Sequence, residues 1–225
     1  MTTSSLDKIE IETAPNPSVA VIWLHGLGAD GNDFVPIVRE LDLTGCPAIR
    51  FIFPHAPTMP VTINNGYVMR AWYDILGADL VKREDEAGLR KSQTAIEQLI
   101  DQQKSLGIPA QRIVLAGFSQ GCAMALQTGL RHSEKLAGLL CLSGYVPLNT
   151  AVTNERHLAN QATPIFLAHG RSDPVIPLNR AEQSRDLLLA LNYSVEWHEY
   201  PMQHSVCPEE IDDIGRWLRR VLVAT

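Results

Sequence analysis

Apolar residues along the chain gather in short runs that alternate with helical patterns. Residues 19–24 form a continuous apolar run, typical of a strand buried on both faces, and residues 48–53 form another that ends at Pro54. Residues 8–13 alternate polar and apolar positions, as a half-buried edge strand does. Similar patterns predict strands at 112–116, 136–142, 164–168 and 194–200, and helices at 34–41, about 84–106, from 122, 178–191 and from 208.

This alternation predicts an α/β fold, in which a mostly parallel central sheet is covered by helices on both faces. We expect residues 1–225 to form a single domain, because the length suits one core and no repeat or linker interrupts it. In such sheets ligands bind at the carboxyl ends of the strands.

One segment, residues 55–79, breaks the alternation. It holds several prolines and the turn sequence Asn64-Asn65-Gly66, and residues 143–160 are likewise predicted to form a polar loop. The segment also carries large apolar side chains, which either line a substrate pocket or pin the segment to the body of the protein. These side chains are Met69, Trp72, Ile75 and Leu76.

Composition narrows the range of partners. The 225 residues are 45% hydrophobic and 20% charged, with a formal net charge of -6 and no basic stretch. Binding to nucleic acid or to an anionic membrane therefore has no electrostatic basis. Small neutral or hydrophobic substrates fit better. Residues 1–10 hold no basic leader or apolar run, and no stretch approaches a membrane span, which favours the cytoplasm. Four scattered cysteines predict reduced thiols, with no metal site.

The chemistry of the chain centres on residues 117–121, Gly-Phe-Ser-Gln-Gly. This G-x-S-x-G pattern stands between an apolar strand and a helix, where small residues on both sides of the serine permit a sharp turn. Such a turn exposes Ser119 at the positive end of the helix, beside free backbone N–H groups. The setting indicates a nucleophile.

A serine nucleophile needs a base whose imidazole is oriented by an acid. Asp173 follows the strand at 164–168 and is fixed by Pro174, although the same pair also fits a simple turn. His204 is the preferred base, because it lies in a short loop between the last strand and the last helix.

Three other histidines lie at strand ends but precede the nucleophile or the acid, so we expect them to line or support the site: His25, His55 and His169. A developing oxyanion needs two donors. We expect one from the backbone N–H of Gln120 and one from that of Leu27, in a glycine-flanked loop that also fits a simple turn.

Together these segments resemble the phospholipase/carboxylesterase family of α/β-hydrolases, whose eukaryotic relatives include the acyl-protein thioesterases. The resemblance covers nearly the whole chain, in the segments His25-Gly26-Leu27-Gly28, His55-Ala56-Pro57, Trp72-Tyr73-Asp74, Gly117-Phe118-Ser119-Gln120-Gly121, His169-Gly170 with Asp173, and Met202-Gln203-His204. It implies an α/β-hydrolase fold without a large cap domain and a serine hydrolase of carboxylic esters or thioesters of modest acyl length. The matching positions imply Ser119 as nucleophile, Asp173 as acid, His204 as base, and Leu27 with Gln120 as oxyanion donors.

Two positions depart from many relatives. Cys122 stands where they carry a third glycine-type residue, and Arg70-Ala71 stands where they carry Pro-Ser. Arg70 puts a cation near the expected acyl groove, so acyl preference cannot be copied from relatives. To that groove we assign Met69, Trp72, Ile75, Leu76 and Val175.

Several other functions are alternatives at this point. Lysophospholipase and protein depalmitoylation make the same demands on the triad, and a peptidase is a further alternative. A dienelactone hydrolase would prefer cysteine in place of Ser119 at the turn of the G-x-S-x-G pattern, which is called the elbow. A non-catalytic ligand-binding protein would lack a triad member. We expect no cofactor, and a homodimer is an open alternative to a monomer.

Overall fold

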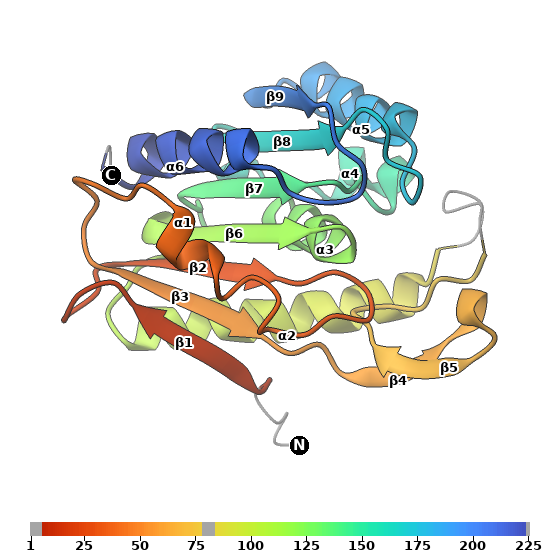
Figure 1. The fold of residues 1–225 in the computed structure, drawn as a ribbon, viewed down its shortest axis with the longest axis horizontal. Helices are drawn as coiled ribbons and strands as arrows, with labels where there is room; N and C mark the ends of the chain where they lie inside the picture. The colour runs from red at the N-terminus through yellow and green to blue at the C-terminus, as the bar shows by residue number, and fades with distance from the viewer. Residues whose placement is uncertain (1–5, 78–83, 224–225) are drawn as a thin grey trace.

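The computed structural model describes residues 6–77 and 84–223. Its centre is a seven-stranded sheet with the order β1-β3-β2-β6-β7-β8-β9 (Figure 1). Neighbouring strands are parallel except at one edge, where β1 is antiparallel to β3. The strands are β1 (Lys8–Glu12), β2 (Val19–Leu24), β3 (Ile49–Pro54), β6 (Ile113–Phe118), β7 (Gly138–Leu142), β8 (Ile165–Gly170) and β9 (Val195–Tyr200).

Helices cover both faces of this sheet. Residues of α1 and α6 pack in the core on one face, and residues of α2, α3, α4 and α5 pack on the other (Figure 1). The mostly parallel α/β architecture predicted from the sequence is therefore confirmed. The helices are α1 (Ile37–Glu40), α2 (Glu86–Ser105), α3 (Gln120–Gly129), α4 (Asn149–Glu155), α5 (Leu178–Ala190) and α6 (Pro208–Val223), with short 3-10 turns at Thr62–Asn64, Ala110–Arg112 and Leu158–Asn160.

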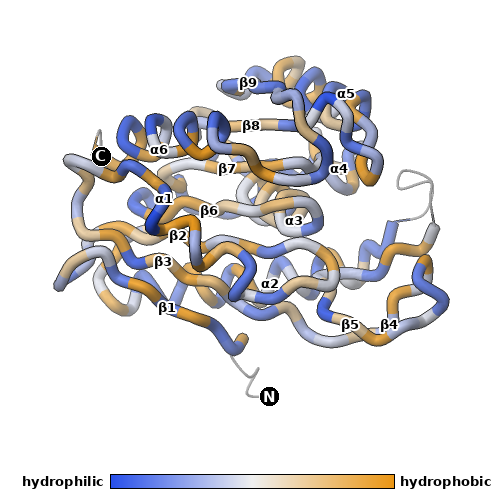
Figure 2. Tube along the Cα trace, viewed as in Figure 1, coloured by the Kyte–Doolittle hydropathy of each residue, from blue (hydrophilic) through white to orange (hydrophobic). Residues whose placement is uncertain are grey.

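The pattern of burial follows the pattern of the sequence. All six residues of β2 are buried, in agreement with its continuous apolar run. Along the edge strand β1, polar and apolar residues alternate (Figure 2). The core therefore lies against the central strands, and the connecting loops follow at the carboxyl ends of these strands.

Three elements differ from the prediction. The helix expected at 34–41 is only α1, because Pro36 disfavours a helical backbone in the residue before it. The loop expected at 143–160 contains α4, a short polar helix that buries only Val152 and has too few apolar positions to show a period.

The third difference lies within the predicted excursion at 55–79, of which residues 78 and 79 fall outside the described part of the chain. It contains a two-stranded antiparallel sheet of β4 (Thr58–Val61) and β5 (Tyr67–Arg70). Each strand has four residues and β4 includes Pro60, so neither shows the signal of a typical strand. This hairpin projects beside the main sheet (Figure 1).

Candidate active site

Ser119 lies on a strained turn between β6 and α3. Its backbone has φ 56° and ψ -117°, a conformation that residues other than glycine rarely adopt. Glycine is needed on both sides: a Cβ on Gly117 would lie 2.2 Å from the Gly121 carbonyl oxygen, and one on Gly121 would lie 2.1 Å from that of Leu24. The turn presents the serine at the carboxyl end of a central strand.

The side chains of Ser119, His204 and Asp173 form one chain of hydrogen bonds. Ser119 Oγ lies 2.8 Å from His204 Nε2, and His204 Nδ1 lies 2.6 Å from Asp173 Oδ2. Because a carboxylate only accepts hydrogen bonds, Nδ1 carries the imidazole proton, and Nε2 is left to accept the proton of the serine hydroxyl. The three segments nominated from the sequence therefore meet at one point.

Two backbone N–H groups hold the other oxygen of the buried Asp173 carboxylate. Val175 and Ile176 donate to Oδ1 at 2.8 and 2.9 Å. Donors aimed at both oxygens offset the cost of burying the charge. Asp173 is thus both the turn former that the sequence allowed and the hydrogen-bond partner of His204.

The loop after β8 is joined by backbone hydrogen bonds to the end of β9 and to the loop that follows it: Arg171 N donates to Tyr200 O at 2.9 Å, and Ser172 N donates to Met202 O at 3.1 Å. Gly170 permits this approach, since a Cβ there would lie 2.3 Å from the Gln203 carbonyl oxygen. The acid and the base are therefore fixed relative to each other by the backbone as well as by their own contact.

Two aromatic side chains support this arrangement. The Phe118 ring packs on the His204 imidazole with 4.8 Å between centroids. Phe118 occupies a variable position of the G-x-S-x-G pattern, so the pattern does not predict this contact. His169 is fully buried, with Nε2 2.8 Å from Ile176 O and 3.4 Å from Asp173 Oδ2. Burial lowers the pKa of the His169 imidazole, so this ring supports the acid's loop in its neutral form.

The backbone N–H groups of Leu27 and Gln120 are available beside the serine. Both residues line the same cavity as Ser119, and among the described residues neither N–H donates to a backbone carbonyl in a turn, loop or cap. The Gln120 side chain is pinned at both ends, with Oε1 accepting from Trp72 N and Nε2 donating to Tyr73 O, each at 2.8 Å. The first turn of α3 is thereby tied to the excursion.

A cavity of about 330 Å³ opens beside Ser119. Most of its lining is apolar or aromatic, as in typical small-molecule pockets. The lining residues are Leu27, Ile63, Asn64, Tyr73, Ile75, Ser119, Gln120, Tyr145, Val175 and Ile176.

Ile75 and Val175, two of the five residues assigned to the acyl groove, line this cavity. Trp72 does not. It is 2% exposed, its ring lies 5.3 Å from the His25 ring between centroids, and it donates its Nε1 hydrogen to His25 O at 2.9 Å. The structure therefore places Trp72 behind the wall as a packing residue, because its indole N–H finds a partner in the core.

Met69 and Leu76 also lie outside the cavity lining, in contrast to their assignment. Met69 belongs to the hairpin, and its sulfur accepts a hydrogen bond from Asn64 at 3.5 Å. Leu76 follows Ile75 directly and is half-buried, but it is absent from the residues that line the cavity. Of the two neighbours, Ile75 is therefore the one that faces the cavity.

Tyr73 and Tyr145 form a polar pair in the cavity wall that sequence reasoning did not assign. Their hydroxyl oxygens lie 3.0 Å apart, and both side chains are buried. Burial raises the pKa of both phenols, that of Tyr145 to about 12, so both stay protonated at neutral pH. The only signal in the sequence is the position of Tyr73 next to Trp72.

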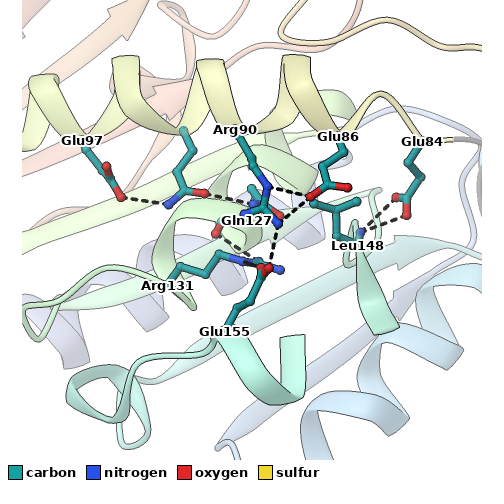
Figure 3. A network of polar contacts seen from close by, with 9 residues as sticks. Glu84, Glu86, Arg90, Glu97, Gln127, Arg131, Leu148 and Glu155 are labelled. Carbon is teal, nitrogen blue, oxygen red and sulfur yellow. Dashed lines mark hydrogen bonds and ion pairs between the residues drawn. The ribbon is translucent and has the colours of Figure 1, made fainter. Parts of the chain in front are cut away.

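A network of charged side chains supports the loop that carries Tyr145. Both carboxylate oxygens of Glu84 lie 3.1 Å from Leu148 N, in the loop after β7 (Figure 3). Nearby, Glu155 of α4 accepts from Arg90 of α2 and from Arg131, each at 2.7 Å (Figure 3). The pair with Arg90 links α4 to α2, and the pair with Arg131 links α4 to the segment after α3.

Other kinds of site are less well supported. In the parts of the chain that the structure describes, no group of three or more His, Cys, Asp or Glu side chains could hold a metal ion. The helices within those parts are all too short or too polar to cross a membrane. Cys122, at the departure from relatives, is fully buried, and a Cβ on Gly144 would lie 2.5 Å from its sulfur, so it fills space behind the elbow.

The strained serine turn between a central parallel strand and a helix, in a sheet covered on both faces, defines the α/β-hydrolase class. The family model described as Phospholipase/Carboxylesterase matches residues 7–222, and the chain belongs to this family. The protein is therefore an enzyme that hydrolyses carboxylic esters, as the resemblance implied.

Individual relatives agree with this membership. Acyl-protein thioesterase 1 of Yarrowia lipolytica is 41% identical over 206 residues, which cover 89% of this chain and 91% of that protein. Acyl-protein thioesterase 1 of Gibberella zeae is 37% identical over 236 residues, covering 99% and 98%. The crystal structure of Arabidopsis thaliana SOBER1 is similar with a TM-score of 0.85 and 29% identity, covering 91% of this chain and 99% of that one.

Proposed function

We propose that this protein is a serine carboxylesterase that hydrolyses esters and thioesters of short to medium acyl chains through Ser119, His204 and Asp173. The observation that carries the proposal is the continuous hydrogen-bond chain from Ser119 Oγ to Asp173, beside an apolar cavity. A hydroxyl becomes a good nucleophile when an oriented imidazole takes its proton, and this geometry supports that transfer.

The reaction proceeds in two similar halves. Ser119 Oγ attacks the acyl carbonyl carbon as its proton moves to His204 Nε2, and Asp173 stabilises the imidazolium. The negative charge on the former carbonyl oxygen is stabilised by the N–H groups of Leu27 and Gln120. The tetrahedral intermediate collapses, and the leaving oxygen or sulfur takes the proton from His204. Water then attacks the acyl-enzyme in the same manner and releases the acid and Ser119.

The size of the cavity supports the acyl length. At ~30 Å³ for a water-sized group, a cavity of about 330 Å³ holds on the order of ten heavy atoms. An acyl chain of about ten atoms therefore fits in the cavity beside Ser119, and a longer one extends beyond it. Apolar side chains in the lining favour the alkyl part of such a group.

A second candidate is hydrolysis of long-chain thioesters on proteins, or of lysophospholipids. The observation that favours it is the name of the relatives, acyl-protein thioesterase 1, at 37% and 41% identity. Ile63 and Val175, which line the cavity, are 43% and 60% exposed, and this apolar rim offers a long chain a surface to lie along. A cytoplasmic location and a homodimer stay predictions from the sequence.

Rates on three substrate classes distinguish these candidates. The purified protein is compared on p-nitrophenyl butyrate and octanoate, on a palmitoylated cysteine peptide, and on a lysophosphatidylcholine. We expect the highest kcat/KM on the short and medium aryl esters. A kcat/KM for the palmitoyl peptide or the lysolipid at least ten times that of the esters would overturn the preference and favour the second candidate.

A further inference from the structure

The peptide group between Gly26 and Leu27 is held from one side by the ring of His25. His25 Nδ1 lies 2.7 Å from the carbonyl oxygen of Gly26, which also accepts from Ala29 N at 3.3 Å. The peptide unit is planar and trans, so its C=O and N–H point in opposite directions. Fixing the Gly26 carbonyl therefore fixes the direction of the Leu27 N–H, the donor assigned to the oxyanion.

The His25 ring is itself held in one tautomer. Its Nε2 accepts from Ala56 N at 3.0 Å, so the ring proton lies on Nδ1 and points at the Gly26 carbonyl. The side chain is 1% exposed, and burial lowers the pKa of the imidazole, which keeps the ring neutral. A neutral ring in this tautomer makes both contacts at once.

Arg70 completes the support from the last residue of β5. Its Nη1 donates to the carbonyl oxygen of Ala56 at 2.7 Å, and its own carbonyl oxygen accepts from Gly28 N at 2.9 Å. The two sides of the oxyanion loop are thus attached to one residue: Gly28 directly, and Gly26 through Ala56 and His25. Gly28 has φ 78°, so this end of the loop follows a turn that suits glycine.

We propose that His25 and Arg70 are positioning residues that orient the Leu27 N–H toward the oxyanion formed on the acyl group attached to Ser119. The inference rests on the proposed function and adds to it a role for the cation that departs from many relatives. The Arg70 guanidinium is directed at a backbone carbonyl, so it acts on the rate of the chemical step and does not select the acyl chain.

Three variants test the role: Arg70→Met, which keeps the length of the side chain without the donor, Arg70→Lys, which keeps a donor, and His25→Asn. Loss of an oxyanion donor costs about 10²- to 10³-fold in kcat, and a misaligned donor costs part of that. We expect kcat on p-nitrophenyl butyrate to fall roughly 10-fold in Arg70→Met and about 100-fold in His25→Asn, with KM within about two-fold. Arg70→Lys retains most of the activity, and Arg39→Met, at an exposed position of α1, serves as the control.

The deciding readout is the affinity of an alkyl boronic acid, whose tetrahedral adduct places an oxygen where the oxyanion forms. Its inhibition constant should rise in Arg70→Met by about the factor by which kcat/KM falls, while the relative rates on acetate, butyrate and octanoate stay as in the wild type. A lower melting temperature with unchanged kcat, or a lower kcat with unchanged boronate affinity, contradicts the positioning role. If His25→Asn does not fold, the Arg70 pair decides.

Different results would overturn the proposed function and the positioning role. Ester hydrolysis absent from the wild type, or retained in Ser119→Ala, overturns the proposed function. An active wild type and an inactive Ser119→Ala, combined with Arg70→Met and His25→Asn at wild-type rates, overturn only the positioning role.

Discussion

The two sides of the site are built in different ways. On one side, the loops after β6, β8 and β9 bring Ser119, Asp173 and His204 into hydrogen-bond contact. On the other side, the cavity wall comes from the excursion before α2 and the loop after β7, with Ile75 and Tyr145 among its residues. The first side depends on where parallel strands end, and the second on tertiary packing. Changes to the first should therefore alter the chemical step, and changes to the side chains that form the wall, such as Ile75, should alter substrate choice or stability.

The largest effect is expected from removing the nucleophile or the base. Ser119→Ala and His204→Ala should lower kcat on p-nitrophenyl butyrate by roughly 10⁴- to 10⁶-fold, because the remaining groups only bind and polarise the substrate. Steady-state kinetics at high enzyme concentration measure this loss. Ser105→Ala, at an exposed position at the end of α2, is the matched control and should keep the wild-type rate.

The acid comes next in size. Asp173→Asn keeps the shape of the side chain but removes its charge, so the imidazolium loses its stabilising partner and the ring its preferred tautomer. We expect kcat to fall by about 10³- to 10⁴-fold with little change in KM. A loss of less than 10-fold would mean that the contact between Asp173 and His204 only holds the loops together.

Trp72 tests the other side of the comparison. Because the indole is 2% exposed and pairs with His25 O, Trp72→Ala should cost about 3–5 kcal/mol of unfolding free energy. Urea unfolding measures the cost. The relative rates on p-nitrophenyl acetate, butyrate and octanoate should not change, and a shifted chain-length profile would instead return Trp72 to the acyl groove.

Ile75 and Leu76 form a natural pair of test and control. Ile75→Trp fills part of the cavity and should lower kcat/KM on octanoate relative to acetate by about 10-fold, or roughly 1.4 kcal/mol. Leu76→Trp, one residue along and outside the lining, should leave this ratio within about two-fold. Equal effects of the two variants would contradict the assignment of the wall.

The smallest effect concerns pH and the network behind Tyr145. Burial raises the pKa of Glu84, despite the nearby Arg180 and Arg131. The folded protein therefore holds this proton to higher pH than the unfolded chain, and stability falls as pH rises from the ordinary value through the raised one. Glu84→Gln should reduce this decline in melting temperature. The matched control Glu40→Gln, at an exposed position of α1, should decline as the wild type does.

Ser119, Asp173 and His204 could be predicted from the sequence because each is marked by a local pattern. The glycines around Ser119, the turn at Asp173 and the loop at His204 each follow an apolar strand, and strand ends meet at one edge of a parallel sheet. The same reasoning supplied the sheet and most of its helices.

The residues of the cavity wall could not all be predicted from the sequence, because contacts between distant segments decide which side chains face the cavity. Trp72 and Ile75 are both large apolar residues of the same excursion, so the sequence does not distinguish their roles, but of the two only Ile75 lines the cavity. The role of Arg70 depends on the carbonyl of Ala56, 14 residues away, and no periodicity signals such a contact. The ion pair between Glu155 of α4 and Arg90 of α2 likewise joins residues that are far apart in the sequence.

The most direct test of the central claim is to locate the nucleophile by covalent labelling. A fluorophosphonate reacts with a serine whose proton is taken by an oriented imidazole, and mass spectrometry of the digested protein finds the labelled residue. The account predicts one adduct per chain, on Ser119, lost in Ser119→Ala and much slower to form in His204→Ala. An adduct on a different residue, formed in Ser119→Ala at the wild-type rate, would contradict it.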